Sequence, residues 1–274
     1  MNRLPWFFEY YRKLGVEHFF VVDNGSTDGS TEFLIRQKDV HLFRTEENYG
    51  EAASGMQWIN SLVNKYGKKH WCIYVDVDEA LIFPGIEQNN LRYLTNYMRK
   101  KGQEAFSTFM LDMYPPNTNG IFKNELVDPM TLSPYFDNNY RFFGSHKCPY
   151  IEVTGGIRNN LFHERVSLTK TPIIDGNKGI KFLSSSHRIT PARVSDVTGV
   201  LLHYKLISDL ARKSFEESQL KLRNYYCTGR HLNYKNVLEK LGDDHNLINP
   251  LSLRYESSEQ LVKLGLMSKP EDFG

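Results

Sequence analysis

The sequence predicts an α/β fold with a mostly parallel sheet flanked by helices and a loop-rich C-terminal half. Strand-like apolar runs alternate with segments of helical spacing from residue 4 to residue 113, a pattern that requires crossovers between parallel strands. Two of those strands end in turns that contain several acids. Residues 115–190 combine scattered Pro, Asn and Gly with recurring aromatic residues, which is typical of long loops packed on a sheet rather than of a disordered linker.

The expected elements follow from two periodicities. Apolar residues three or four positions apart mark helices, and short runs rich in Val, Ile and Phe between turn-forming residues mark strands. Ala52, Met56, Ile59 and Val63, for example, lie on one face of a helix. In chain order we expect a helix at 4–14, strand 18–22, helix 31–37, strand 40–44, helix 52–63, strand 71–75, helix 91–98, strands 105–113 and 197–206, and helix 208–225.

Composition excludes several classes of protein. The chain has 274 residues, 40% of them hydrophobic, which is enough for a packed core in one large domain. Its 34 basic residues nearly balance 32 acidic ones, so net charge gives no reason to expect nucleic acid as a partner. No apolar stretch approaches the roughly 20 residues that span a bilayer, and the start lacks the features of a signal peptide. Three scattered cysteines without CxxC spacing favour a reducing compartment, so we expect a cytoplasmic protein.

Three acids follow directly on the strand expected at 71–75. Asp76, Asp78 and Glu79 stand within four positions in WCIYVDVDEAL, and carboxylates at the end of a buried strand repel one another and are costly to desolvate. Carboxylates at i and i+2 of a strand point the same way. A hard divalent cation, Mn²⁺ or Mg²⁺, that also carries a diphosphate would therefore offset the cost. The alternative is that Asp76 and Asp78 cap a helix or lie in a solvated turn.

A second acidic turn, DNGSTDG, follows the strand expected at 18–22. Its Asp and Ser side chains can satisfy the first amides of the next helix. Because ligand crevices of α/β sheets lie beyond the carboxyl ends of strands, Asp23 and Asn24 can also hydrogen-bond the base or ribose of a nucleotide. The turn is not a P-loop, since no GK[ST] follows, and it lacks GxGxxG spacing.

Four segments together resemble the bacterial family 2 glycosyltransferases with a GT-A fold: LGVEHFFVVDNGSTDGS, WCIYVDVDEAL, TGGIRNNLF and GVLLHYKL. They occur in the family's order and cover most of the chain. The resemblance implies one GT-A-like, Rossmann-like domain over residues 1–274, with a nucleotide-sugar-binding half at 1–114 and an acceptor-binding half at 115–274. It also implies inverting transfer of a sugar from a nucleotide-diphosphate donor to a hydroxyl of a saccharide or glycolipid acceptor, as in bacterial surface polysaccharide synthesis, with contact to the inner face of the membrane.

The resemblance further implies roles for single residues in binding the donor and a metal ion. Glycosyltransferases of this kind use Mn²⁺ or Mg²⁺ to hold the donor's diphosphate. By role, these residues are Asp23 and Asn24 for the nucleoside, Asn48 and Gly50 in the donor-side loop, Asp76 and Asp78 for the metal and diphosphate, and His203 in LLHYK for the metal.

Four residues have two interpretations each. His203 is otherwise a hydrogen-bonded core histidine. Arg158 follows two glycines in a turn, where it is either exposed or pairs with phosphate or an acidic sugar. His187 in SSSHR belongs to a polar turn or faces the acceptor. Asp112 either caps a turn or is the general base that deprotonates the acceptor hydroxyl.

The start of the chain departs from the family pattern. Such enzymes usually open with a strand ending in an Asn-Glu turn, whereas Asn2 and Arg3 stand at that place here. An open sheet edge left by that strand would invite association. We therefore expect either an upstream strand in the cell or an oligomer.

Two other functions are open at this stage. A sugar-phosphate nucleotidyltransferase also uses a metal and a doubly wound nucleotide site, but its Gly-rich, basic N-terminal loop is not visible in this sequence. A catalytically silent carbohydrate-binding protein would keep the fold without activity. Stabilisation by a nucleoside diphosphate only when Mn²⁺ is present would favour the transferase.

Overall fold

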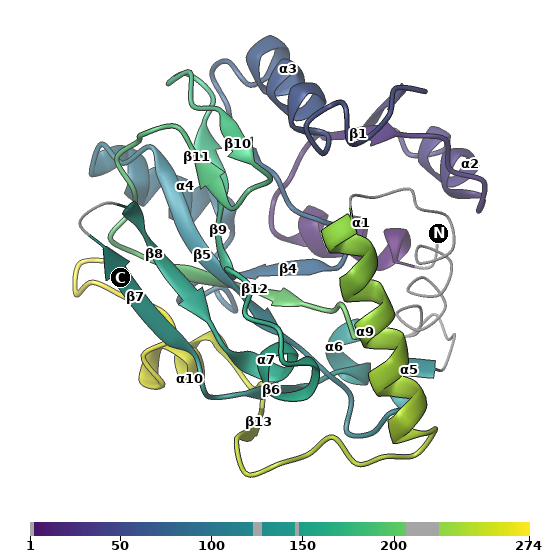
Figure 1. The fold of residues 1–274 in the computed structure, drawn as a ribbon. Helices are drawn as coiled ribbons and strands as arrows, with labels where there is room; N and C mark the ends of the chain where they lie inside the picture. The colour runs from purple at the N-terminus through teal and green to yellow at the C-terminus, as the bar shows by residue number, and fades with distance from the viewer. Residues whose placement is uncertain (1–2, 123–127, 146–147, 207–224) are drawn as a thin grey trace. The chain divides into compact units, whose positions relative to one another are not determined.

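The computed structural model describes residues 3–122, 128–145, 148–206 and 225–274 and shows a mixed α/β fold (Figure 1). The first half contains α1 (Leu4–Lys13), β1 (Phe19–Asp23), α2 (Ser30–Ile35), β2 (Val40–Arg44), α3 (Met56–Tyr66), β3 (Trp71–Ile73), β4 (Glu79–Ile82), α4 (Leu91–Lys100) and β5 (Ala105–Asp112). The second half contains α5 (Asn119–Phe122), α6 (Pro129–Leu132), β6 (Tyr135–Asp137), β7 (Arg141–Ser145), β8 (Cys148–Thr154), α7 (Gly156–Phe162), β9 (Thr169–Asp175), β10 (Phe182–Ser184), β11 (Arg188–Ile189), β12 (Gly199–His203), α9 (Tyr225–Leu241), β13 (Ser252–Arg254) and α10 (Ser258–Lys263).

The chain divides into two compact units that do not follow its two halves. Unit 1 comprises Met1–Thr108, Lys170–Val200 and Leu261–Gly274, and unit 2 comprises Phe109–Thr169 and Leu201–Gln260. The boundaries fall inside β5, β9, β12 and α10. Residues distant in sequence therefore belong to the same unit, and each unit is described below by itself.

The expected α/β class is confirmed, but the strands pair in a mixed rather than a uniformly parallel arrangement. β1 and β2 do pair in parallel, but they form a two-stranded sheet of their own. The largest sheet has the strand order β3-β9-β5-β12-β4, and β3 pairs with β9 in antiparallel fashion. The reason is that strands from the C-terminal half enter this sheet, so the helix–strand alternation of the first half does not determine its directions.

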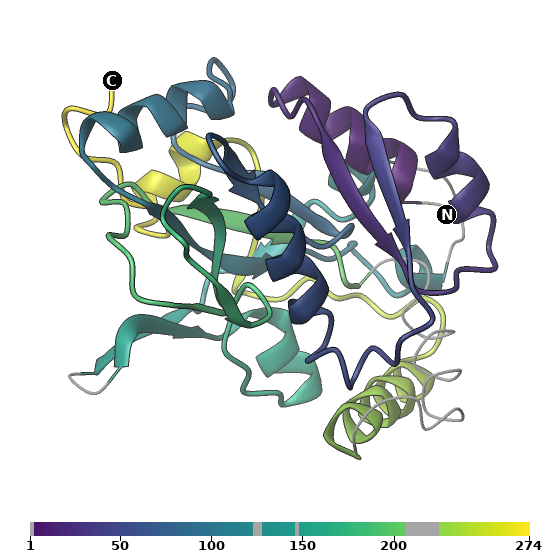
Figure 2. The same ribbon diagram turned by 90° about the horizontal axis from the view of Figure 1, so that it is seen from above.

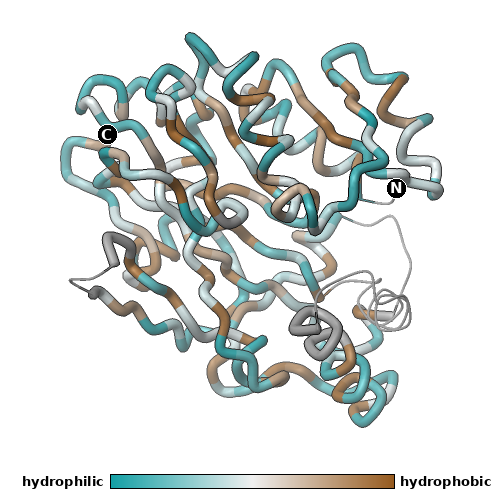
Figure 3. The backbone as a smooth tube through the Cα atoms, turned by 45° about the horizontal axis from the view of Figure 1, so that its top comes forward, coloured by the Kyte–Doolittle hydropathy of each residue, from teal (hydrophilic) through white to brown (hydrophobic). Residues whose placement is uncertain are grey.

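Most elements expected in the first half are confirmed. Helices are found at α1, α2, α3 and α4, and strands at β1, β2 and β5, within a few residues of their expected bounds. β12 confirms the later strand, whereas the helix expected at 208–225 lies outside the described residues except for Tyr225, the first residue of α9. The hydropathy colouring in Figure 3 shows hydrophobic stretches along such elements and hydrophilic residues in many turns between them.

The region expected to consist of long loops contains more regular structure than predicted. β7 and β8 form an antiparallel hairpin in which Arg141 lies opposite Thr154, and β9 is buried over six of its seven residues. In unit 2, α7 and α9 share a hydrophobic cluster that includes Tyr114, Phe162 and Tyr234. This cluster gives unit 2 an apolar core of its own.

Helix α1 is fixed to unit 1 by aromatic packing and by two tyrosine hydroxyls. Phe8 packs edge-on against Phe19 of β1 at a ring-centroid distance of 4.8 Å, and Figure 2 shows α1 beside the β1–β2 pair. The Tyr10 hydroxyl donates to the Leu81 carbonyl at 2.7 Å. The Tyr11 hydroxyl donates to the Glu79 carbonyl at 3.0 Å and accepts from the Leu81 amide at 3.2 Å.

Replacing Tyr11 by Phe is therefore expected to lower the free energy of unfolding by about 1–3 kcal/mol, because two buried backbone groups of β4 lose their partner. Urea unfolding measures the change. Tyr66→Phe is the matched control, since Tyr66 is partly exposed, and it should change stability by less than about 0.5 kcal/mol. Equal losses in both variants would show that the Tyr11 hydroxyl does not hold α1 to β4.

Among the helices that the structure describes, none is long and apolar enough to cross a membrane.

Candidate functional site

A buried lysine holds the acids that follow β3. Lys170 Nζ lies 2.9 Å from Asp76 Oδ2 and 2.5 Å from Glu79 Oε1. The side chains of Lys170 and Glu79 are 2% and 0% exposed, whereas that of Asp76 is 50% exposed. Part of the cost of placing these carboxylates together is thus offset by an ammonium group 91 residues beyond Glu79.

The local backbone explains this arrangement. β3 ends at Ile73, so Asp76 lies in a turn rather than on the strand, and β4 begins at Glu79. The Asp76 amide donates to Glu79 Oε2 at 3.1 Å, which directs the Glu79 carboxylate back into the turn. Lys170 comes from β9, a strand of the same sheet as β3 and β4.

Burial and the neighbouring charges both shift the pKa values of Glu79 and Lys170. Burial, reinforced by the charge of Asp76, raises the pKa of the Glu79 carboxyl above its ordinary value, and Lys170 only partly opposes this. Burial lowers the pKa of Lys170, but Glu79 and Asp76 outweigh it, so that the pKa of the ammonium is raised and it keeps its proton. The result is a permanently charged lysine beside a carboxyl group whose ionisation is costly.

Asp78 has a different cationic partner. Its Oδ2 accepts from Arg3 Nη1 at 3.1 Å, and both side chains are about one-fifth exposed. The three carboxylates and two cations carry one net negative charge if Glu79 is ionised, and none if it is protonated. This cluster alone therefore offers no attraction to a diphosphate.

Ligand number, exposure and charge together decide whether these residues fit a divalent cation. Among the described residues no group of three or more His, Cys, Asp or Glu side chains is arranged to hold a metal, but Mg²⁺ is commonly bound through only one or two carboxylates with water and phosphate as the other ligands. Asp76 fits that role, because it is half-exposed and Lys170 contacts it through Oδ2. A divalent cation would also give the cluster the positive charge that a diphosphate needs.

The turn after β1 is held by its own side chains. Asp23 is buried, its Oδ1 accepts from the Ser26 amide at 3.0 Å, and its Oδ2 accepts from the Thr31 hydroxyl at 2.8 Å. Burial raises the pKa of Asp23, but the hydrogen bonds from Ser26 and Thr31 and the charge of Arg44 bring it below its ordinary value. The carboxylate therefore stabilises the turn and the start of α2, which is the structural role anticipated from the sequence.

Asn24 and the loop after β2 come together at one edge of the β1–β2 pair. Asn24 is exposed, and its Nδ2 donates to the carbonyls of Thr45 and Glu47 at 3.1 and 3.0 Å. In the same loop, Asn48 Oδ1 accepts from the Gly50 amide at 2.8 Å. Because the strands are parallel, these segments follow their carboxyl ends at the same edge. Asn24, Asn48 and Gly50 thus form one exposed polar loop cluster of unit 1.

Unit 2 contains a separate buried cluster centred on Asp112. Its Oδ2 accepts from Arg158 Nε at 2.7 Å, and its Oδ1 lies 2.6 Å from His203 Nδ1. All three side chains are less than one-tenth exposed. Burial raises the pKa of the Asp112 carboxyl, but Arg158 and His203 outweigh it, so that the pKa lies below its ordinary value.

The Asp112 cluster bears on three expected roles. Both oxygens of Asp112 are already engaged, which disfavours it as the group that takes a proton from an acceptor. Arg158 is buried against Asp112 rather than exposed in a turn. A carboxylate at one ring nitrogen is the usual support of a metal-binding histidine, and it also serves a buried structural histidine, so the contact to His203 agrees with both interpretations.

The two glycines before Arg158 have a packing reason. Gly155 has φ +126°, and a Cβ there would come 2.6 Å from the Asn139 carbonyl oxygen. A Cβ on Gly156 would come 2.5 Å from the Tyr140 hydroxyl, which accepts from the Asp112 amide. The glycines therefore allow α7 to approach the segment at 139–140, and this approach places Arg158 against Asp112.

His187 lies in unit 1 between β10 and β11, partly exposed, in the turn expected from SSSHR.

The structure places the other sequence-predicted residues in three groups. Asp76, Asp78 and the unpredicted Lys170 form one group in unit 1, Asp23, Asn24, Asn48 and Gly50 lie around the β1–β2 edge of unit 1, and Asp112, Arg158 and His203 form the buried group in unit 2.

Lys170 was missed by sequence reasoning although a signal was present. It stands in SLTKTPII, where a lysine lies shortly before the apolar residues Ile173 and Ile174. A buried lysine requires a paired carboxylate, and the chain offers such carboxylates in DVDE. The sequence alone does not say that these two segments meet.

Comparison with known proteins gives no match: no family model, no curated protein and no solved structure matches this chain.

Proposed function

We propose that the protein is a glycosyltransferase that moves a sugar from a nucleotide-diphosphate donor to an acceptor hydroxyl. The observation that carries the proposal is the acidic segment at 76–79, in which half-exposed Asp76 forms an ion pair with buried Lys170. The segment is fixed in place, and it gains the charge to bind a diphosphate only with an added cation. This is the property expected of the metal and diphosphate site that the resemblance implies.

Other polar groups of unit 1 support the same proposal. Asn24, Asn48 and Gly50 provide exposed amide and backbone groups at the carboxyl ends of β1 and β2, where α/β sheets bind ligands. We propose that they contact the nucleoside of the donor. Asp23 would act indirectly, because its oxygens hold the turn that carries Asn24.

The chemistry follows from the movement of charge during transfer. The acceptor oxygen bonds to the anomeric carbon as the bond from that carbon to the diphosphate breaks, and the acceptor proton passes to a base. Mn²⁺ or Mg²⁺, held by Asp76 with Asp78 as a further proposed ligand, would supply positive charge to the departing diphosphate. Lys170 orients Asp76, and Asp112 is proposed to position His203 rather than to accept the proton itself.

A thermal-shift panel tests the proposal. We expect one of UDP, GDP or CDP to raise the melting temperature, and to do so more strongly with Mn²⁺ than in EDTA, because a ligand that binds the native state stabilises it by mass action. Asp76→Asn should remove the Mn²⁺-dependent part of the shift. Asp243→Asn, an exposed acid in unit 2, should leave the shift unchanged.

The other outcomes contradict specific parts of the proposal. A shift that is the same in wild type and Asp76→Asn excludes Asp76 as the metal and diphosphate ligand. Stabilisation by a nucleoside triphosphate in preference to every diphosphate would favour the nucleotidyltransferase. No shift with any nucleotide would favour the silent carbohydrate-binding protein.

A further inference from the structure

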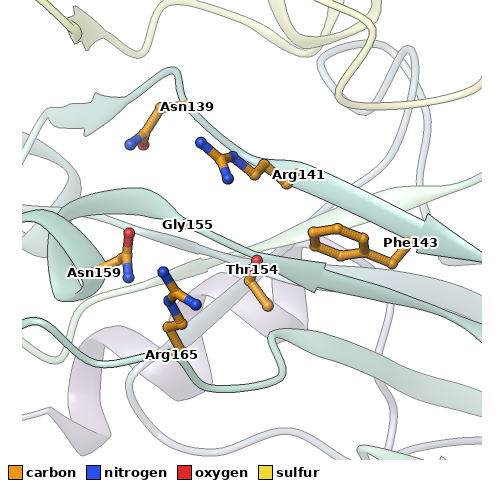
Figure 4. A pocket seen from close by; sticks show the side chains of 7 residues that line it. All are labelled: Asn139, Arg141, Phe143, Thr154, Gly155, Asn159 and Arg165. Carbon is orange, nitrogen blue, oxygen red and sulfur yellow. The ribbon is translucent and has the colours of Figure 1, made fainter.

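A pocket of about 370 Å³ lies in unit 2, apart from the Asp112 cluster. Its volume is within the range of small-ligand sites. Figure 4 shows that Arg141 and Arg165 extend from different segments toward the same space, with Asn159 and Phe143 also at its walls. We propose that this pocket binds an anionic group on a hydroxyl-bearing ligand, either a phosphate ester or a carboxylate of an acidic sugar.

The first argument is charge. Arg141 and Arg165 are exposed, and within the part of the chain that the structure describes neither guanidinium has an ion-pair or hydrogen-bond partner. Two guanidinium groups that converge without a carboxylate repel each other. An oxyanion between them removes that repulsion and can accept hydrogen bonds from both in the bidentate manner that suits Arg.

The second argument is that the backbone fixes the walls of the pocket. Arg141 and Phe143 are two positions apart on β7 and so lie on one face of the hairpin, and Arg141 is opposite Thr154 of β8. Asn139 Oδ1 accepts from the Gly156 amide at 3.0 Å, and its Nδ2 donates to Asn160 at 2.9 Å. Asn139 is thereby held as part of the wall rather than being available to a ligand.

The third argument is that neutral groups beside the arginines suit a sugar. Asn159 lines the pocket, and its Nδ2 donates to the Glu164 carbonyl at 3.4 Å, which fixes the orientation of its amide group. Thr154 adds a hydroxyl, and the ring of Phe143 is 51% exposed. Amide, hydroxyl and aromatic groups can contact the hydroxyls and the C–H face of a sugar ring while the arginines hold its charge.

One carboxylate of the hairpin, that of Glu152, is already engaged by a hydroxyl. Glu152 lies opposite Phe143 in the hairpin, and its carboxylate accepts a hydrogen bond from the Ser167 hydroxyl. It therefore limits the affinity for highly charged ligands and favours a singly or doubly charged group.

NMR titration of the ¹⁵N-labelled intact chain tests the inference, without nucleotide, so that its result is independent of the proposed transferase activity. The probes are inorganic phosphate, glucose 6-phosphate, glucuronate and uncharged glucose. We expect the arginine Nε–H and Gly155 amide signals to shift with glucose 6-phosphate or glucuronate, and glucose to bind at least roughly tenfold more weakly, since hydrogen bonds to charged groups supply about one such factor each. The tighter of the two charged sugars identifies the phosphate ester or the carboxylate as the natural group.

Single variants locate the binding. Arg141→Gln and Arg165→Gln should each weaken binding roughly tenfold, whereas Arg254→Gln, an exposed arginine of unit 2 outside the pocket, should leave it unchanged. An unchanged amide spectrum in each variant confirms that it is folded. The inference is overturned if no charged probe shifts the pocket signals, if glucose binds as tightly as the charged sugars, or if Arg254→Gln weakens binding as much as the pocket variants.

Discussion

Lys170→Met is expected to lower the free energy of unfolding at pH 7 by about 3–5 kcal/mol, the usual effect of leaving a buried charge without its partner. The Lys170 side chain is 2% exposed and contacts both Asp76 and Glu79. Without it, Glu79 must be buried either as an unpaired anion or as a protonated acid. Chemical denaturation of the variant and the wild type measures the difference.

The stability that Lys170→Met loses should depend on pH in a definite direction. Burial already raises the pKa of Glu79 above its ordinary value, and removal of Lys170 raises it further. In the variant, the folded state then holds a proton that the unfolded state releases above about pH 4.3. Both proteins should therefore lose stability as pH rises above about 4.3, and because the folded pKa of Glu79 in the wild type is about 8, the gap between the variant and the wild type should widen only above about pH 8.

Two further variants separate a specific pair from general damage. Adding Glu79→Gln to Lys170→Met should restore part of the lost stability, because the buried acid is gone while an acceptor for the Asp76 amide remains. Lys178→Met removes a lysine that is 42% exposed and paired with Glu104, and should change stability by at most about 1 kcal/mol. A double variant that loses the sum of both single effects would show that Lys170 and Glu79 do not form a stabilising pair.

Asp112→Asn is expected to be comparably damaging, with a loss of about 3–5 kcal/mol at pH 7, because Arg158 would remain buried without a counter-charge. Folding lowers the pKa of Asp112. The contribution of Asp112 to stability is therefore fully present above its pKa of about 3.9 in the unfolded state, and it is lost as pH falls through the lower pKa of the folded state. The difference between variant and wild type should therefore shrink only below about pH 4.

Denaturant unfolding of a small set of variants checks this expectation. Asp128→Asn is the control, since Asp128 is exposed, caps α6, and Asn caps a helix about as well as Asp. Adding Arg158→Met to Asp112→Asn should recover stability. If Asp112→Asn is no more damaging than the control, the cluster of Asp112, Arg158 and His203 is not the electrostatic centre of unit 2.

Local sequence patterns predicted the first half of the fold well. β2 has the expected bounds at 40–44, and α1 and α4 begin at the expected residues, because each is governed by short-range periodicity and turn residues. β9 was missed because Thr, Lys and Pro172 interrupt its apolar run, and Pro usually argues against an interior strand. Its strand conformation comes from its neighbours in the sheet, which no local pattern reveals.

The candidate site was only partly visible in the sequence for the same physical reason. The acids at 76–79 were recognised as needing a counter-charge, but the choice between a metal and a lysine depends on a contact across 94 residues between Asp76 and Lys170. Likewise, the sequence left Arg158 either exposed in a turn or paired with phosphate or an acidic sugar, and its pairing with Asp112 depends on how Gly155 and Gly156 pack. The residue types predicted which segments carry charged side chains, and the tertiary structure determines which of those side chains form ion pairs.

Calorimetric titration of the intact protein with the nucleoside diphosphate selected by the thermal-shift panel is the most direct test of the central claim. The same nucleoside and its monophosphate are titrated in parallel, each with Mn²⁺ and with EDTA. A glycosyltransferase that releases a nucleoside diphosphate should bind that diphosphate with Mn²⁺ at least roughly tenfold more tightly than the nucleoside, since each charge-assisted contact to phosphate adds about 1.5–3 kcal/mol. Equal affinities for nucleoside and diphosphate, or no binding of either, would contradict a diphosphate site at Asp76 and with it the proposed function.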